Sequence, residues 1–327
     1  MKLRNYLIYQ YVYIKKIIAF SLIVSFIILI NIKTFNIEKK KQNKVCLCTC
    51  GKDENRYIKE FVNHYINYGV DKIFIYDNND INGERFETIL KEYLNNNSVE
   101  IINYRGKLKI QMDAFNDCYK KLRKKYDWFI FYDIDEFIHL KNFSNIKDYL
   151  NQNHFIKCNA IYLNQILHTD NNQIYYFNSS LAERFPKTYE FNKFENNSII
   201  LHLKGIIKTI LKGNLKNIRI TNPHFLSSEI SKTCNGEGKF INQNDIHLKN
   251  PDHKNYYFDH YYFKSCEEYL HKQLKGDVFY GNIIKMNLNR LVTYFSFNKL
   301  NEKKLDYFIR NTNLNLNMNF FKSKSLV

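Results

Sequence analysis

The chain has 327 residues, of which 45% are hydrophobic and 16% aromatic, so it is long enough for one large domain with a sizeable core. Its formal net charge is +17, but the basic residues are dispersed along the sequence. No zinc-finger, helix-turn-helix or RNA-recognition motif accompanies that charge, which excludes nucleic acid as an expected partner.

An uncharged, mostly apolar run occupies residues 17–32 and predicts a transmembrane anchor. A spanning helix needs roughly 20 residues, within a range of about 17–25, and flanking lysine stems extend the reach of a short one. A cleaved signal peptide is the competing interpretation, although no small-residue cleavage site follows the run. A basic, aromatic tail over 1–16 and a basic linker over 33–44 flank the run. Because both flanks are basic, the sequence does not indicate the orientation in the membrane.

Strands and helices alternate after the linker. The apolar pattern predicts strands over 45–49, 72–76, 99–104 and 128–132, separated by helices over 54–68, 84–94 and 112–126. This β-α-β-α-β-α-β order favours a parallel sheet with helices packed on its faces. In such sheets ligands bind beyond the carboxyl ends of the strands.

Polar residues stand directly after three of these four strands. They are Lys52-Asp53-Glu54, Asp77-Asn78-Asn79 and Asp133-Ile134-Asp135-Glu136. The sequence therefore predicts a ligand site at this edge of the sheet.

The third group carries the chemistry. On an extended segment, Asp133 and Asp135 would point the same way and suit a hard divalent cation. Such a cation can bridge a diphosphate and offset the charge that develops on it as a leaving group. Lys264, Lys272 and Lys275 are basic residues that could assist. Three carboxylates inside an apolar stretch are costly without a partner, which favours a functional site over a surface loop.

The seven cysteines are odd in number and irregularly spaced. Cys46, Cys48 and Cys50 alternate along one predicted strand, so they would share a face and be poorly placed to bond one another. The spacing also differs from that of a structural zinc site. We therefore expect buried thiols rather than a disulfide framework.

Three segments together resemble glycosyltransferase family 92 and its family 2-like relatives. They read KDENRYIKEFVNHYINYGVDKIFIYDNND, DWFIFYDIDEFIHL and DHYYFKSCEEYLHKQLKGD, and they keep the family's order and spacing across residues 45–281. The short segment KGIIKT and the turn Asn222-Pro223-His224 are similar to further elements of the family. Asp53 departs from the pattern, since the family favours Asn at that position.

The resemblance implies a GT-A fold: an α/β, Rossmann-like nucleotide-sugar-binding domain with a mixed, mainly parallel sheet. It also implies a nucleotide-sugar donor, usually UDP-linked, and Mn²⁺ or Mg²⁺ as cofactor. Carried over, Asp133 and Asp135 would hold the metal and the donor diphosphate. His260 is the candidate for a further metal ligand, with His224 as the alternative.

For the donor, the resemblance places Asp77 near the base and Glu54 near the uridine pocket. The donor-binding residues expected are Lys52, Glu54, Asp77, Asn78, Asp133, Lys264 and Lys275. If the reaction inverts the sugar, a carboxylate must deprotonate the acceptor hydroxyl. Glu183 and Glu190 are the candidate bases.

The hypothesis is a single-pass membrane enzyme with a transferase domain over 45–290 and a C-terminal extension over 291–327. It would move a sugar to a hydroxyl of a glycan or other glycoconjugate. Its domain would face a Golgi-type lumen in a eukaryote and the cytoplasm in a bacterium. The alternatives are a metal-dependent nucleotidyltransferase, or a non-catalytic basic membrane-surface protein on a degenerate transferase fold.

Overall fold

The computed structural model describes residues 11, 13–27, 42–191, 203, 205–227, 229–242, 246–248, 251–275 and 288–312. The chain divides into two compact units, Met1–Gln42 and Asn43–Val327. Within the first unit, residues 13–27 are helical. None of the helices that the structure describes combines the length and apolar character needed to cross a membrane. Residues 28–32 of the predicted anchor lie outside the described residues, and the anchor stays a prediction.

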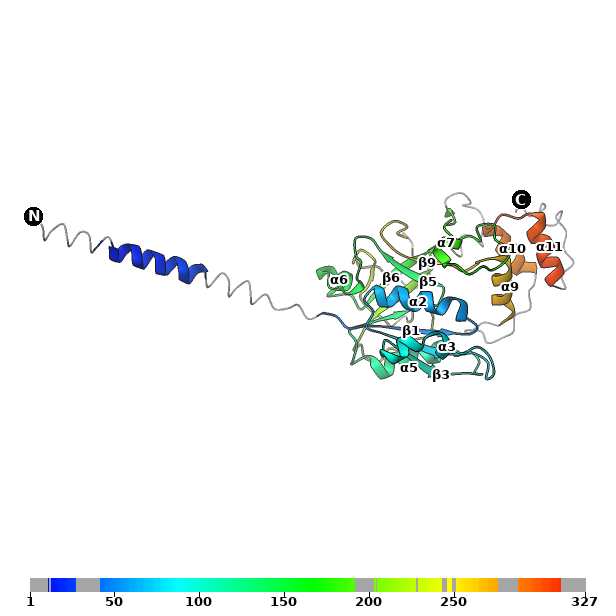
Figure 1. Cartoon of the computed structure of the whole chain (residues 1–327), viewed down its shortest axis with the longest axis horizontal. Coiled ribbons are helices and arrows are strands. Elements are labelled where there is room, and N and C mark those ends of the chain that lie inside the picture. Colours follow the sequence, from blue (N-terminus) through cyan, green and yellow to red (C-terminus); the bar gives the residue numbers. More distant parts are fainter. Residues whose placement is uncertain are drawn as a thin grey trace, which may run out of the picture. The chain divides into compact units, whose positions relative to one another are not determined.

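Nine strands are described in the second unit (Figure 1). They are β1 (Val45–Gly51), β2 (Lys72–Asp77), β3 (Val99–Asn103), β4 (Trp128–Phe131), β5 (Glu136–Leu140), β6 (Ala160–Leu167), β7 (Ile207–Lys212), β8 (Thr233–Asn235) and β9 (Tyr256–His260).

The helices described in this unit include several of only one turn. They are α2 (Asn55–Asn67), α3 (Phe86–Ile89), α4 (Lys91–Asn95), α5 (Gln111–Leu122), α6 (Ile146–Leu150), the 3₁₀ helix η1 (Asn153–Phe155), α7 (Leu181–Arg184), α9 (Cys266–Leu274), α10 (Leu288–Phe297) and α11 (Glu302–Asn311). The single helix predicted over 84–94 was wrong: α3 and α4 are separate because Leu90, which is fully buried, leaves helical geometry between them.

One mixed sheet joins the nine strands, in the order β3-β2-β1-β4-β7-β6-β9-β5, with β8 beside the first half of β6. The strands β3, β2, β1 and β4 are parallel, as predicted from their alternation with helices. Beyond them, β7 runs antiparallel to both β4 and β6, and β5 runs antiparallel to β9. The predicted fold class, α/β with a mixed and mainly parallel sheet, is confirmed.

The core lies on both faces of the sheet. Val45 and Leu47 of β1 belong to a buried cluster that also contains the apolar side of α2. The residues between and after them, Cys46 and Cys48, belong to a second cluster that contains the apolar side of α5. Because both faces of β1 are covered, all seven of its residues are buried, which explains the unbroken apolar strand sequence.

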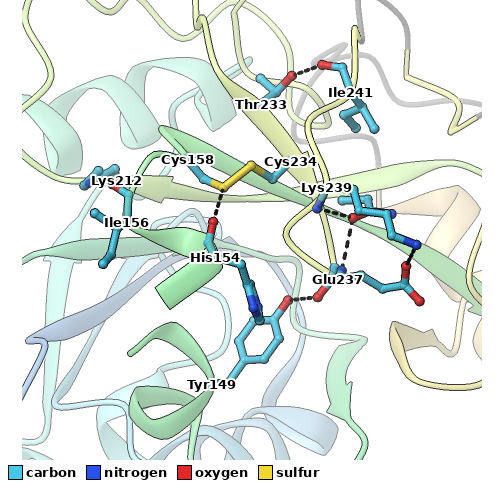
Figure 2. Close-up of a disulfide and its surroundings, with 12 residues drawn as sticks. Tyr149, His154, Ile156, Cys158, Lys212, Thr233, Cys234, Glu237, Lys239 and Ile241 are labelled. Atoms are coloured by element: carbon cyan, nitrogen blue, oxygen red, sulfur yellow. Dashed lines mark hydrogen bonds and ion pairs between the residues drawn. A yellow bond between two sulfur atoms is a disulfide. The ribbon is translucent and has the colours of Figure 1, made fainter. Parts of the chain in front are cut away.

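Two pairs of cysteines are bonded, so the expectation of free buried thiols was wrong for four of the seven. Cys48 of β1 is joined to Cys118 of α5, whose Cα atoms lie 6.5 Å apart. Cys158 is joined to Cys234 of β8 (Figure 2), whose Cα atoms lie 5.9 Å apart. Neither bond joins same-face neighbours on one strand: helix packing and sheet pairing bring the partners together from distant parts of the sequence.

The C-terminal helices pack on the rest of the second unit. Figure 1 shows α9, α10 and α11 gathered at one end of it. Leu291 and Phe308 share an apolar cluster with Leu167 at the end of β6. A buried ion pair between Lys304 of α11 and Asp170 also joins the C-terminal helices to the rest of the unit. The two side chains are 0% and 2% exposed. The part of 291–327 that the structure describes is thus continuous with the domain core.

The Lys304–Asp170 pair yields a stability prediction. Tyr294 donates to the Asp170 carboxylate over 2.6 Å, and Lys304 also donates to the Lys299 carbonyl over 2.9 Å. Replacing Lys304 with Met leaves Asp170 buried with no cation, which should lower the free energy of unfolding by about 3–5 kcal/mol. Urea denaturation measures this loss.

The control is Lys303→Met, one residue away and exposed. It should change the free energy of unfolding by less than about 0.5 kcal/mol. Equal effects of the two substitutions would contradict the importance of the buried pair.

Candidate active site

The candidate site is built on the short connection from β4 to β5. The backbone NH of Glu136 donates to the carbonyl of Asp133 over 3.0 Å, which closes a turn. The prediction that Asp133 and Asp135 lie on an extended segment was therefore wrong. The turn directs their carboxylates toward different partners and places Glu136 at the start of β5.

Lys208 of β7 is the cation beside Asp133 and Glu136. Its ammonium lies 2.6 Å from Asp133 Oδ2 and 3.0 Å from Glu136 Oε2, and the Lys208 side chain is 0% exposed. Continuing the β4–β7 register by two residues from the Ile130–Ile210 pair brings Lys208 level with the residue before Asp133. Antiparallel pairing thus delivers a buried lysine to the acidic turn.

These contacts set the charge of the two carboxyl groups. Burial would raise the pKa of Asp133, but the Lys208 ammonium outweighs burial and holds this pKa below its usual range. Burial raises the pKa of Glu136 to about 8, against the opposing effect of Lys208. Gln111 of α5 also donates to Asp133 Oδ1 over 2.8 Å. Asp133 is therefore an anion with a protein donor on each oxygen.

Asp135 is paired with two other lysines. Lys264 and Lys272 lie 2.8 and 2.7 Å from the same oxygen, Asp135 Oδ2. Burial opposes ionisation of Asp135, but these two ammonium groups hold its pKa well below the usual range. Asp135 is thus a fully charged carboxylate.

His260 completes the centre, since it pairs with Glu136 across the β5–β9 ladder. Gln165 donates its amide to the Leu203 carbonyl, which turns its oxygen toward His260 Nδ1 at 2.7 Å. Nδ1 therefore carries the proton. Burial lowers the pKa of His260 to about 3, so Nε2 presents a lone pair.

The lone pair of His260 faces two carboxylate oxygens, 3.7 Å from Asp135 Oδ1 and 3.9 Å from Glu136 Oε1. Asp135 Oδ1 and His260 Nε2 are two acceptor atoms 3.7 Å apart, a separation that a divalent cation can bridge. Among the described residues, no group of three or more His, Cys, Asp and Glu has the arrangement of a complete metal site. Mg²⁺-type cations commonly use one or two carboxylates and take the remaining ligands from substrate phosphates and water. The residues present fit an ion of that kind.

The alternative ligand, His224, is placed differently. Its Nδ1 lies 3.1 Å from the Ile207 carbonyl and donates to it, because a carbonyl only accepts. Burial lowers its pKa to about 4. His224 interacts electrostatically with Lys208 and Asp133.

The loops after β1, β2 and β3 are cross-linked to one another. Lys52 lies 2.7 Å from Asp80, and the backbone NH of Asp53 donates to Asn79 over 2.7 Å. Arg105, which follows β3, pairs with Asp77 at 2.6 Å. Asp77 was predicted to lie near the base of the nucleotide. In the structure its carboxylate accepts hydrogen bonds from Arg105 and Asn79.

Other polar atoms at this edge have no partner among the described residues. Glu54 Oε1 pairs with Lys275 at 2.5 Å, whereas Glu54 Oε2 is buried without a partner. Asn78 is 5% exposed, and its Oδ1 is likewise buried without a partner. A buried acceptor without a donor is costly unless a ligand supplies one.

The two candidate bases, Glu183 and Glu190, take no part in the ion pairs described above. Glu183 forms the capping box of α7 with Ser180 and also accepts from Ser179, so its carboxylate is committed to the helix end. Its side chain is exposed, as is Glu190. The predicted role as acceptor base stays a prediction.

Lys208, Gln111 and Arg105 were not among the predicted site residues. Lys208 had a signal, since it lies between apolar residues of β7 in the segment KGIIKT, which resembles an element of the family. Gln111 and Arg105 had none, because their importance follows from packing against the turn and the loops.

The fold and these residues define an α/β protein with an acidic turn and buried lysines at the carboxyl edge of its parallel strands. Glycosyltransferase family 92 matches residues 41–305, and the chain belongs to this family.

Two plant proteins of the family show the extent of the similarity. A glycosyltransferase family 92 protein of Oryza sativa subsp. japonica is 29% identical over 120 residues, which cover 36% of this chain and 20% of that protein. One of Ricinus communis is 28% identical over 109 residues, which cover 33% of this chain and 19% of that protein. The match thus spans about a fifth of the length of these relatives.

Among solved structures, S. aureus TarS 1-349 in complex with UDP-GlcNAc is 15% identical, with a TM-score of 0.36. The alignment covers 82% of this chain and 73% of that one.

The contacts of Lys208 generate a prediction. Lys208→Met leaves Asp133 as a partly buried anion without its ammonium and should lower the free energy of unfolding by about 3–5 kcal/mol. In Lys208→Met/Asp133→Asn, no charge remains on Asp133, and Glu136 can become neutral because its pKa is about 8. The double variant should therefore be more stable than Lys208→Met alone, as measured by urea unfolding at pH 7. Additive losses would contradict a charge pairing between Lys208 and Asp133.

Proposed function

We propose that this protein transfers a sugar from a nucleotide-sugar donor to a hydroxyl group of a glycan or other glycoconjugate, on a GT-A type domain. Membership of the family supports the reaction class. The observation that carries the proposal within this chain is the acidic turn, where Asp135 and His260 leave a gap for a cation beside three lysines. A metal ion and nearby ammonium groups can together offset the negative charge of a donor diphosphate.

The donor diphosphate would lie between the acidic turn and α9. Lys264, Lys272 and Lys275 supply ammonium groups at this position, on the loop before α9 and along its last turn. Asp135 and His260 would hold Mn²⁺ or Mg²⁺, with phosphate oxygens as further ligands. Bound there, the metal supplies positive charge that stabilises the departing diphosphate.

The nucleoside end would lie against the loops after β1 and β2. Uracil presents one NH donor beside a carbonyl acceptor, and the side chain of Asn78 presents an acceptor and a donor. The buried Asn78 Oδ1 has no partner among the described residues, so a base NH would satisfy it. This supports a UDP-linked donor, with Asp77 and Arg105 fixing the loop that carries Asn78.

The acceptor side of the site would have to supply a catalytic base. An inverting reaction needs a carboxylate to take the proton of the acceptor hydroxyl. Because Glu183 is committed to capping α7, we retain Glu190 as the candidate base. Measuring the turnover of the donor by Glu190→Gln and by Glu183→Gln tests this assignment. Only Glu190→Gln should lose activity.

Calorimetric titration with UDP and UDP-sugars tests the donor proposal. Binding should require Mn²⁺, disappear in EDTA and weaken at least about tenfold in Asp135→Asn, because one carboxylate ligand is lost. Asn78→Ala should weaken UDP binding about tenfold and leave the binding of inorganic pyrophosphate unchanged, because only the base contact is lost.

Absence of binding by well-folded protein to any nucleotide would overturn the transferase proposal and favour a non-catalytic surface protein. Product mass separates the remaining alternative, since a nucleotidyltransferase would add a nucleotide instead of a sugar to the acceptor.

We further propose that the domain faces an oxidising compartment, such as a secretory lumen. The bonds Cys48–Cys118 and Cys158–Cys234 support this, because such bonds persist in oxidising environments and are rare in the cytosol. Asn142 and Asn178, each within an Asn-x-Ser sequence, are exposed and accessible to glycan addition there. If the predicted anchor is retained, the proposal implies that the basic N-terminal tail lies on the cytoplasmic side.

Thiol counting tests the compartment. Cells that make the protein are quenched in acid, and the chain is alkylated under denaturing conditions without reductant. Three cysteines should react, namely Cys46, Cys50 and Cys266. A parallel sample reduced first should show all seven. Seven reactive cysteines without reduction would place the domain in a reducing compartment.

A further inference from the structure

Asp135 Oδ2 has two ammonium partners, and their surroundings differ. Lys264 precedes α9, its side chain is 4% exposed, and its ammonium lies 4.8 Å from the centre of the Tyr57 ring. Lys272 belongs to the last turn of α9, its side chain is 25% exposed, and its ammonium lies 4.2 Å from the Tyr262 ring. One lysine is enclosed by protein, whereas the other approaches Asp135 from the open side.

The other oxygen of the same carboxylate faces the cation gap. Asp135 Oδ1 lies 3.7 Å from His260 Nε2, the ring nitrogen that presents a lone pair. A divalent cation bound there would share one carboxylate with both lysines, so four positive charges would surround a single negative one. Asp133 offsets little of this excess, because its charge is already paired with that of Lys208. Like charges at this range repel strongly in a buried site.

An incoming diphosphate relieves the excess. It brings negative charge to the same place and accepts hydrogen bonds from ammonium groups. Of the two lysines on Asp135, only Lys272 has both solvent exposure and a long side chain on a helix surface, so it can turn without opening the core. Lys264 is held by its burial against Tyr57.

We propose that Lys272 is an exchangeable counter-ion: it neutralises Asp135 when no donor is bound and moves to the donor diphosphate when a divalent cation occupies the Asp135–His260 gap. This inference rests on the proposed function and adds to it a coupling between metal and donor. Lys272 competes with the metal when the metal binds alone, and assists the donor once the metal is in place. A mere tether between α9 and the acidic turn would do neither.

The two roles predict opposite effects of one substitution. Lys272→Met keeps the side-chain stem on Tyr262 and removes the charge. In the first titration, Mn²⁺ is added alone, and its binding is measured by the loss of the electron paramagnetic resonance signal of the free ion. Lys272→Met should bind Mn²⁺ about threefold to fivefold more tightly than the wild type does. UDP titrated at saturating Mn²⁺ should bind about tenfold weaker, because a charge-assisted hydrogen bond is lost.

Lys303→Met is the matched control, since it removes the same charge from an exposed position on α11. It should alter neither affinity. Near-ultraviolet circular dichroism and urea unfolding establish that both variants are folded before titration.

Shifts of the two affinities in the same direction, or no shift in either, would overturn the exchange while leaving the proposed function intact. Failure of the wild type to bind both Mn²⁺ and UDP would overturn the proposed function and the exchange with it. Weaker Mn²⁺ binding in Lys272→Met would show instead that Lys272 positions Asp135 for the metal, which also contradicts the exchange.

Discussion

Neutralising the carboxylates of the β4–β5 turn is the constraint on which the site depends. A parallel strand buried on both faces ends in three acidic residues, and burying such charges without partners is prohibitive. The partners come from the second half of the chain: Lys208 from β7, and Lys264 and Lys272 from the region of α9. The antiparallel half of the sheet and the closing helix are therefore necessary for the parallel half to end in acidic residues. Breaking any of these pairs removes stability and geometry together.

The same pairs give the centre its chemical character. Each lysine is a cation that a diphosphate can contact, and each carboxylate is a ligand that a metal can share. Under the proposed function, donor binding would exchange these internal ion pairs for contacts with the ligand. The loops after β1, β2 and β3 follow the same principle, since Lys52–Asp80, Glu54–Lys275 and Asp77–Arg105 link them into one rim.

A second network stabilises the end of the unit that carries α9. Arg184 of α7 pairs with Glu268 of α9, and both side chains are 0% exposed. Tyr57 of α2 donates to the same carboxylate over 2.7 Å. Since Tyr57 also contacts Lys264, this network joins α2, α7 and α9 to the acidic turn. Together with Lys304–Asp170, it makes the helices at this end a fixed support for the lysines.

The sequence by itself determined the alternating strands and helices of the first half, the acidic group after β4 and the family resemblance, because periodicity, hydrophobicity and residue order are local properties. It also identified Asp135 and His260, which the structure brings within 3.7 Å. Only the tertiary structure decided the rest. The bonds of Cys48 and Cys158, the burial of Lys208 beside Asp133 and the commitment of Asp77 to Arg105 all depend on residues far away in the chain. No local pattern encodes such contacts, since each arises where sheet pairing and helix packing bring two distant segments together.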